Sequence, residues 1–261
     1  MTPEEYDTFT RELQGRLAAD ARVLGLVALG SMAARDYRPD RWSDHDFFVV
    51  VAPGTQEAMR ADLAWLPGRE RIVLSFRETA HGHKVLYDDG HLLEFALFDL
   101  EELSLAHVNR YRVLLDRAGI EARLRQMAAA SARHGHGVAS DEALIGQFLA
   151  NLLVGIGRYR RGEQLSAAQF VKTFALRHLL ILFTRHLPAP QHALLDNLDP
   201  FRRFERVFPS LGAELNTILG QELPLAANAL LALAQRELEG RLPAYPKAAA
   251  AVIKRQLDAE D

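Results

Sequence analysis

The sequence contains no cysteine among its 261 residues. This absence excludes disulfides, thiolate metal ligands and a cysteine nucleophile, and because it fits a reducing compartment we expect a cytoplasmic protein. A large excess of one charge is also missing: the formal net charge is −3, which argues against a nucleic-acid partner. No uncharged apolar run approaches about 18 residues and the start MTPEEYDTF is polar, so we expect neither a membrane span nor a signal peptide.

The residues that are present describe an ordinary globular chain, with 49% hydrophobic and 25% charged residues. The first half alternates between short apolar runs and helical spacing, which predicts a mixed sheet with helices. A turn signal, Asp88-Asp89-Gly90, precedes the strand LLEFALF and indicates a hairpin. The predicted helices cover 3–21, 55–66, 99–107 and 120–130, and the predicted strands cover 23–29, 46–51, 71–76, 84–87, 92–98 and 111–115.

The second half changes character after the small, glycine-containing stretch 131–140, which we interpret as a linker. Helical spacing follows in segments that prolines separate. The predicted helices there cover 141–161, 166–186, 201–208, 211–220, 222–240 and 245–257. We therefore predict an α+β protein: a small mixed-sheet domain over residues 1–135, followed by an all-helical bundle domain over residues 140–261.

The stretch 24–51, LGLVALGSMAARDYRPDRWSDHDFFVVV, carries the most specific chemistry in the chain. Asp44 and Asp46 stand two residues apart at the head of a predicted strand, so their carboxylates should share one face. Gly30-Ser31 ends the preceding predicted strand, and such a turn offers backbone N–H groups and a hydroxyl to an anion. Together these residues predict a site that holds a metal ion and a polyphosphate.

Glu94 is the candidate third acidic residue, because it lies in the apolar strand LLEFALF, where an isolated carboxylate is costly to bury. Three carboxylates around one point repel each other unless cations neutralise them, and Mg²⁺ is the natural occupant. Asp99 is an alternative third carboxylate, although its position suits a helix N-cap better. His45 should point to the opposite face. We interpret His81, His83 and His91 as neutral loop residues rather than as zinc ligands.

Gly30-Ser31, Asp44-x-Asp46 entering a strand, and Glu94 on a later strand together resemble the nucleotidyltransferase superfamily typified by DNA polymerase β. Within that superfamily the sequence is most similar to the antibiotic (aminoglycoside and lincosamide) nucleotidyltransferases, which pair such a domain with a helical one. The motif resemblance covers about residues 23–115, and the second half resembles these enzymes only in architecture. The Arg- and Pro-containing excursion between Ser31 and Asp44 is longer than the family pattern.

The resemblance implies transfer of a nucleoside monophosphate from an NTP, usually ATP, to a hydroxyl of a small molecule, possibly an aminoglycoside. It implies that Gly30 and Ser31 contact the β- and γ-phosphates, and that Asp44 and Asp46 bind Mg²⁺. Glu94 would bind a second metal ion or act as general base. Lys172, on a predicted helix of the second half, would reach the triphosphate, although a solvated helix face explains it equally well.

Two other interpretations stay open at this point. One keeps the chemistry and changes the acceptor to a protein side chain or an RNA. The other is a non-catalytic nucleotide-binding protein or toxin–antitoxin component of the same fold. The sequence does not decide the acceptor, the preferred base or the oligomeric state.

Overall fold

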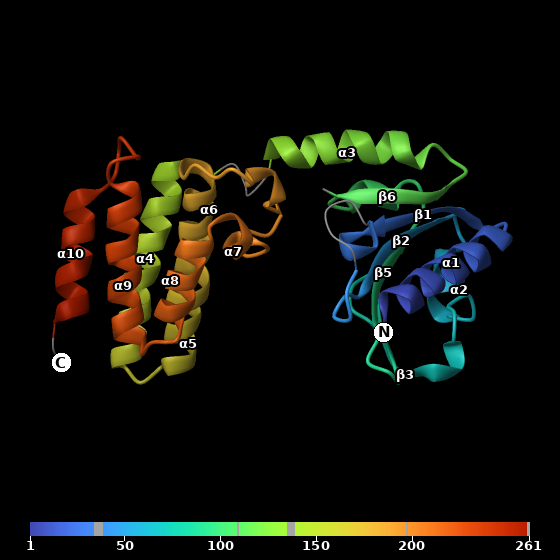
Figure 1. Ribbon diagram of the computed structural model, residues 1–261, viewed down its shortest axis with the longest axis horizontal. Coiled ribbons are helices and arrows are strands. Elements are labelled where there is room, and N and C mark those ends of the chain that lie inside the picture. Colours follow the sequence, from blue (N-terminus) through green and yellow to red (C-terminus); the bar gives the residue numbers. More distant parts are fainter. Residues whose placement is uncertain (34–38, 109, 135–138, 197, 260–261) are drawn as a thin grey trace. The chain divides into compact units, whose positions relative to one another are not determined.

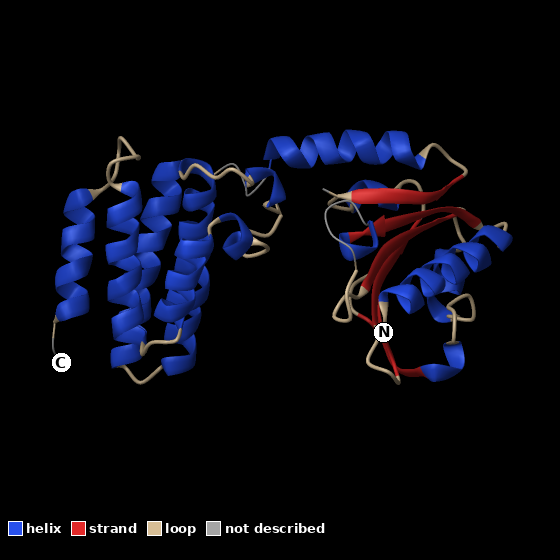
Figure 2. Ribbon diagram, in the orientation of Figure 1, coloured by secondary structure: helices blue, strands red, loops and turns tan. Residues whose placement is uncertain are grey.

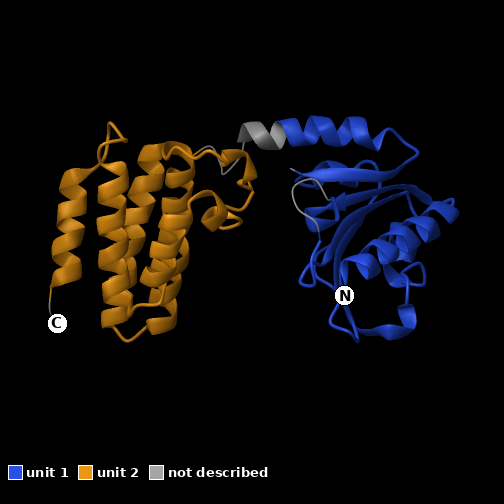
Figure 3. Cartoon of the chain, in the orientation of Figure 1, with its two compact units in different colours: residues 1–133 blue, residues 134–261 orange. Residues whose placement is uncertain are grey.

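The computed structural model describes residues 1–33, 39–108, 110–134, 139–196 and 198–259 (Figure 1). The chain divides into two compact units, Met1–Arg133 and His134–Asp261 (Figure 3). The first unit contains a six-stranded sheet, whereas the described elements of the second unit are all helical (Figure 2). The predicted α+β class is therefore confirmed.

The first unit begins with a helix whose N-terminus is capped as its sequence predicts. The Thr2 hydroxyl accepts a hydrogen bond from the Glu5 backbone N–H, and the Glu5 carboxylate accepts one from the N–H of Thr2. The elements of this unit are α1 (Pro3–Ala19), β1 (Val23–Leu29), η1 (Gly30–Ala33), β2 (His45–Val51), α2 (Gln56–Ala61), η2 (Arg69–Arg71), β3 (Ile72–Arg77), β4 (Gly82–Tyr87), β5 (Leu92–Phe98), η3 (Glu102–Leu105), β6 (Tyr111–Asp116) and α3 (Ile120–His134).

The strands follow the order β3-β4-β5-β2-β1-β6 across the sheet. Only β2 and β5 pair in parallel, with Asp46 opposite Glu94, and the other neighbouring strands are antiparallel. In the antiparallel pairing of β4 with β5, Lys84 lies opposite Glu94. Since side chains in register on neighbouring strands leave the same face of a sheet, these three lie in one row on one face.

The two faces of the sheet are covered differently. Odd-numbered positions of β2 and β5, such as Phe47 and Phe95, belong to a core closed by α1 and α2. On the opposite face Val50 and Phe98 pack with Ile120 and Leu124 of α3. Asp46 and Glu94 are only partly buried on this second face. The row that carries them therefore stays open to a ligand.

Some sequence predictions for the first unit differ from the structure. The helix predicted over 99–107 is the shorter 3-10 helix η3, Glu102–Leu105. The helix predicted over 55–66 ends at Ala61, and the chain then turns so that Trp65 and Leu66 are buried in the core. The Trp65 indole N–H donates to the Met59 carbonyl and fixes this turn. The helix predicted over 120–130 continues to His134, so helical structure takes the first part of the expected linker, whereas residues 135–138 lie outside the described part.

The second unit is built around the helices α4 (Asp141–Arg160) and α6 (Leu176–His186), against which α9 (Leu223–Leu238) packs. Its core includes Phe148, Leu152, Phe183, Leu230 and Leu231. The elements are α4 (Asp141–Arg160), α5 (Gln164–Ala168), η4 (Gln169–Ala175), α6 (Leu176–His186), η5 (His192–Leu194), α7 (Phe204–Val207), α8 (Pro209–Leu219), α9 (Leu223–Leu238) and α10 (Lys247–Asp258).

The segment predicted as one helix over 166–186 contains a π-helical stretch, η4. Gly155 of α4 lies against it, since a Cβ there would come within 2.5 Å of a Val171 methyl group. The run Gln164–His186 is long and apolar enough to cross a membrane by length and composition. Its residues Val171, Leu179, Leu182 and Phe183 are buried inside the helical unit, which makes it a core helix of this unit.

Candidate active site

Gly30 and Asp46 are in close contact, which joins the first two parts of the predicted motif. Gly30 adopts φ +46°, a conformation that favours glycine, as β1 passes into η1. A Cβ at this position would come within 2.6 Å of Asp46 Oδ2. The glycine therefore lets the backbone turn and also lets the carboxylate lie against it.

Glu94 lies beside Asp46, as the sequence predicts for the third acidic residue. The two residues are direct partners in the β2–β5 pairing, so their backbones are about 4.8 Å apart. Two carboxylates at this spacing repel each other unless positive charge lies between or beside them. The arrangement thus creates a local demand for cations.

Lys84 supplies part of that positive charge, and sequence reasoning did not single it out. Its ammonium nitrogen lies 3.0 Å from a Glu94 oxygen and 3.1 Å from Glu78, and these two carboxylates raise the pKa of Lys84. The signal that identifies Lys84 is the hairpin register, which sets it opposite Glu94. Once the Asp88-Asp89-Gly90 turn is located, counting residues back from it along the strand shows that Lys84 lies opposite Glu94.

The donor set fits a divalent cation that shares its ligands with a substrate. Among the described residues, no three His, Asp or Glu side chains form a group that could hold a metal ion. Mg²⁺ usually takes only one or two protein carboxylates and completes its shell with water and substrate phosphates. Asp46 and Glu94 are suited to that mode. The binding of Mg²⁺ by Asp44, Asp46 and Glu94 stays a prediction.

Asp44 is fixed through its main chain at the entry to β2. Its carbonyl accepts hydrogen bonds from the Tyr6 hydroxyl (2.8 Å) and from the Ser31 hydroxyl (3.0 Å). Ser31 is buried, so its hydroxyl ties η1 to the strand entry. The expected contact of Ser31 with phosphate stays a prediction, and the structure gives its side chain this internal partner.

His45 points away from the two aspartates, as predicted, and is fully buried against α1. Its ring stacks on Tyr6 with centroids 3.7 Å apart, and its Nδ1 lies 2.7 Å from Nε2 of His91. The Thr10 hydroxyl donates its proton to the Tyr6 carbonyl, so His45 Nε2–H donates to Thr10 Oγ1 (2.9 Å). That leaves Nδ1 of His45 to accept from His91.

Burial keeps this histidine pair uncharged. It lowers the pKa of His45 to about 3, with a further contribution from His91, and it lowers the pKa of His91 to about 4. The interpretation of His83 as a loop residue was wrong, since it lies within β4 with its ring stacked on Phe95. His91 lies in the turn between β4 and β5, as expected, although it is buried. Phe9 of α1 covers the His91 ring, and Phe95 of β5 covers the His83 ring.

Lys172 lies in η4 of the helical unit, and its ammonium group has partners there. It donates to the carbonyls of Leu219 (2.7 Å) and Gln221 (2.6 Å) at the C-terminal end of α8. A cation is favourable at this end of a helix. The expected contact of Lys172 with a triphosphate stays a prediction, and it requires the ammonium to leave these carbonyls.

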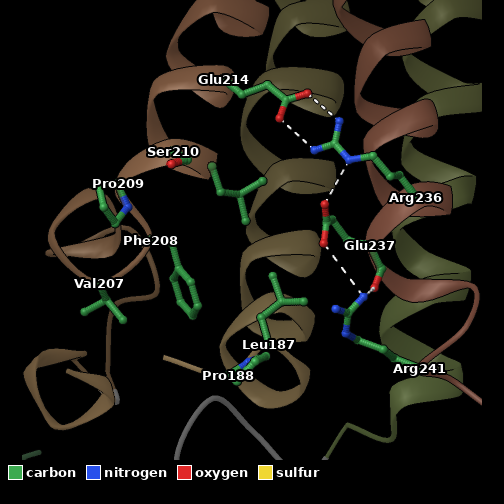
Figure 4. A pocket seen from close by; sticks show the side chains of 11 residues that line it. Leu187, Pro188, Val207, Phe208, Pro209, Ser210, Glu214, Arg236, Glu237 and Arg241 are labelled. Carbon is green, nitrogen blue, oxygen red and sulfur yellow. Dashed lines mark hydrogen bonds and ion pairs between the residues drawn. The ribbon is translucent and has the colours of Figure 1, made fainter. Parts of the chain in front are cut away.

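A cavity in the helical unit has a volume of about 420 Å³ and is lined by residues 187–188 and 207–211, apolar apart from Ser210, and by a charged wall (Figure 4). Arg236 pairs with Glu214 at 2.7 Å and with Glu237 at 2.9 Å, and Arg241 lies 3.8 Å from Glu237. The charges of this wall balance one another. The cavity therefore offers no net charge to a triphosphate.

A smaller cavity of about 170 Å³ lies in the first unit and includes Asp44 in its lining. The other lining residues are Met1, the turn before β2, the β4–β5 turn and Leu92 at the start of β5. This cavity adjoins the candidate site, because Asp44 is the residue that precedes β2 and Asp46 is in that strand. The smaller cavity is thus the one that bears on the predicted chemistry.

No protein-family model and no curated protein sequence matches the chain. Solved structures do match, among them an aminoglycoside 6-adenyltransferase from Bacillus subtilis, with 13% identity, a TM-score of 0.40, and coverage of 95% of this chain and 97% of that one. A STING-associated CdnE c-di-GMP synthase from Capnocytophaga granulosa shares 11% identity, with a TM-score of 0.31 over 97% of this chain and 80% of its own. The CD-NTase CdnG of Bradyrhizobium diazoefficiens, in complex with GTP, shares 13% identity, with a TM-score of 0.25 over 98% and 85%.

These neighbours are nucleotidyltransferases. At these identities and TM-scores, the case for a reaction rests on the chain's own residues, which the contact of Gly30 with Asp46 and the register of Asp46 with Glu94 bring together.

Proposed function

We propose that the chain is a Mg²⁺-dependent nucleotidyltransferase that moves AMP from ATP to a hydroxyl group of a small molecule, with an aminoglycoside-like compound as one candidate acceptor. The observation that carries the proposal is the placement of the Asp46 carboxylate against the Gly30 turn, with Glu94 beside it in register. This placement supports phosphate and metal binding on one side and an acidic group for the acceptor on the other.

In this reaction the acceptor oxygen forms a bond to the α-phosphorus of ATP, and the bond from that phosphorus to the bridging oxygen of pyrophosphate breaks. Asp44 and Asp46 would bind the Mg²⁺ that accompanies the triphosphate, and that ion would neutralise charge on the phosphates. Backbone N–H groups of the Gly30-Ser31 turn would hold the β- and γ-phosphates.

Glu94 has two roles open to it: ligand of a second cation, or base that takes the proton of the acceptor hydroxyl. Lys84 holds the Glu94 carboxylate on the open face of the sheet, 3.0 Å from its ammonium. In either role a fixed carboxylate needs less reorganisation when substrate arrives. Lys84 is then a positioning residue.

The test is pyrophosphate release from Mg–ATP with a panel of aminoglycosides, lincosamides and other polyols. We expect release with at least one acceptor. We expect Asp46→Asn to lower that rate at least about 100-fold, because charge stabilisation at a metal-bound phosphate is worth several kcal/mol. Asp7→Asn, at an exposed carboxylate of α1, is the matched control and should leave the rate unchanged.

Two results would contradict the proposal. One is ATP binding without pyrophosphate release under any acceptor, which would favour the non-catalytic alternative. The other is equal rates for Asp46→Asn and the unaltered protein. Intact-mass measurement of proteins incubated with ATP and the enzyme distinguishes modification of a protein from modification of a small molecule.

A further inference from the structure

The 170 Å³ cavity beside Asp44 has an aromatic wall and an acidic wall, both held by local hydrogen bonds. Trp42 stands on the first wall with 79% of its surface exposed. The second wall is the turn Asp89-Gly90-His91 between β4 and β5. An exposed tryptophan of this size beside a site for a polyphosphate is unusual enough to require an account.

The turn that carries Trp42 is ordered by its own contacts. The Ser43 N–H donates to the Asp40 carbonyl at 3.0 Å, and the Trp42 N–H donates to the Asp40 carboxylate at 2.9 Å. The guanidinium carbon of Arg41 lies 4.4 Å from the centre of the Trp42 ring, so a cation covers part of the indole. The remaining exposed surface can receive a second flat group.

Asp89 is held as an acceptor on the opposite wall. Its oxygens bond to Arg71 at 2.8 Å and to the His91 N–H at 3.0 Å. Partial burial acts to raise the pKa of Asp89, but these hydrogen bonds keep it below its ordinary value. A carboxylate oxygen accepts more than one hydrogen bond, so Asp89 retains capacity to accept from a ligand.

We propose that this cavity binds the base of the nucleotide donor, with Trp42 stacking on the ring and Asp89 accepting from an exocyclic amino group. The inference rests on the proposed function for the position of the phosphates, which Asp44 links to the cavity. Adenine carries such an amino group, whereas hypoxanthine carries a carbonyl in its place. The site therefore selects ATP over ITP.

The first test measures the binding of Mg–ATP, Mg–ITP and Mg–tripolyphosphate to the full chain by calorimetry. Stacking of a base on an aromatic side chain is worth about 1–3 kcal/mol. We therefore expect Trp42→Ala to weaken ATP binding about tenfold and to leave tripolyphosphate binding unchanged. Trp42→Phe should restore most of the affinity. Leu105→Ala, at an exposed apolar residue beyond the opposite end of β5, is the control.

The second test concerns Asp89. Unlike the carboxylate, the amide of Asp89→Asn can donate a hydrogen bond to the carbonyl of hypoxanthine. Asp89→Asn should therefore reduce the preference for ATP over ITP to less than about a third of its original value. Asp88→Asn is the matched control, since Asp88 also pairs with Arg71 at 2.8 Å but does not line the cavity. It should leave the preference intact.

Equal ATP affinity in Trp42→Ala and the unaltered protein overturns the inference, even if pyrophosphate is released. An unchanged ATP preference in Asp89→Asn overturns the assignment of Asp89. Conversely, binding that depends on Trp42 without any pyrophosphate release supports the base site and removes the proposed reaction. The two proposals therefore fail separately.

Discussion

The two units arrange charged side chains differently: the sheet unit places two carboxylates side by side, and the helical unit alternates positive and negative groups. In the sheet unit Asp46 and Glu94 are direct partners in the strand pairing, and the Lys84 ammonium lies 3.0 Å from Glu94. In the helical unit, the charged wall of the large cavity alternates Glu214, Arg236, Glu237 and Arg241, so that each charge meets its opposite (Figure 4). Like charges kept together cost free energy, and a folded protein retains them where a ligand compensates. The proposed reaction places its chemistry in the sheet unit, whereas these helical contacts join charges of opposite sign.

The largest expected difference between the two units is a loss of stability of the sheet unit at low pH. The folded-state pKa values of His45 and His91, about 3 and about 4, lie below the 6.5 of a free histidine, so the unfolded chain binds more protons. Stability that is full above pH 6.5 is lost as the pH falls toward 3. We expect the loss to be on the order of 3 kcal/mol and to fall on the sheet unit.

Both tryptophans lie in the sheet unit, so tryptophan fluorescence in urea reports its unfolding, while far-ultraviolet circular dichroism reports the helices of both units. The double variant His45→Phe/His91→Phe should flatten the acid dependence of the fluorescence midpoint. His107→Phe, at a histidine that is not buried, should not. An acid loss seen equally in the double variant would contradict the role of the pair.

The next effect concerns Gly30. Alanine there must adopt φ +46°, which costs about 1 kcal/mol, and its Cβ would displace the Asp46 carboxylate from 2.6 Å. We expect Gly30→Ala to lower stability by that amount and the rate of pyrophosphate release at least about tenfold. Gly54→Ala is the control, because Gly54 has φ +80° with no atom within 4 Å of a Cβ. It should share the stability loss and keep the rate.

A third effect tests whether Lys172 belongs to the scaffold or to the site. Lys172→Met leaves the carbonyls of Leu219 and Gln221 without their cation, which should destabilise the helical unit by about 1–2 kcal/mol. Circular dichroism in urea measures this, and Lys172→Arg should recover part of it. If the affinity for Mg–ATP falls tenfold in Lys172→Met and is kept in Lys172→Arg, the predicted contact with nucleotide gains support. An unchanged affinity limits Lys172 to the helical unit.

The smallest effect is expected at Lys84. Lys84→Met releases Glu94 from an exposed ion pair, and such pairs contribute little to stability. We expect no measurable change in the urea midpoint and a threefold to tenfold lower rate of pyrophosphate release. Lys84→Arg should keep the unaltered rate. A rate unchanged in Lys84→Met would contradict the positioning role.

Much of the sheet unit was predictable because its strands are continuous apolar runs. The bounds Val23–Leu29 and Leu92–Phe98 agree with the structure, and the register that brings Glu94 to Asp46 follows from them once β5 is placed beside β2. The motif residues needed no packing information, since turn and strand chemistry alone singles them out. Their expected roles stay predictions.

The remainder depended on tertiary packing, which spacing along the chain does not encode. The burial of His91 requires α1 to cover the sheet, with Phe9 at 4.8 Å from its ring. The π-helical stretch around Lys172 requires α4 to approach at Gly155. In the sequence Trp42 lies in a polar stretch and has no evident role. The structure places its exposed ring beside the cavity that Asp44 lines, which suggests the proposed base site.

The parallel pairing of β2 with β5 also affects the order in which parts of the chain fold. The β4–β5 hairpin forms between segments close in sequence, whereas β2 and β5 meet only after α2, β3 and β4 have been passed. Contacts of such long sequence separation form late, because the loop that joins them must first close. Asp46 and Glu94 face each other across this late-forming pair of strands. During refolding, recovery of Mg–ATP affinity should therefore lag behind recovery of helical signal.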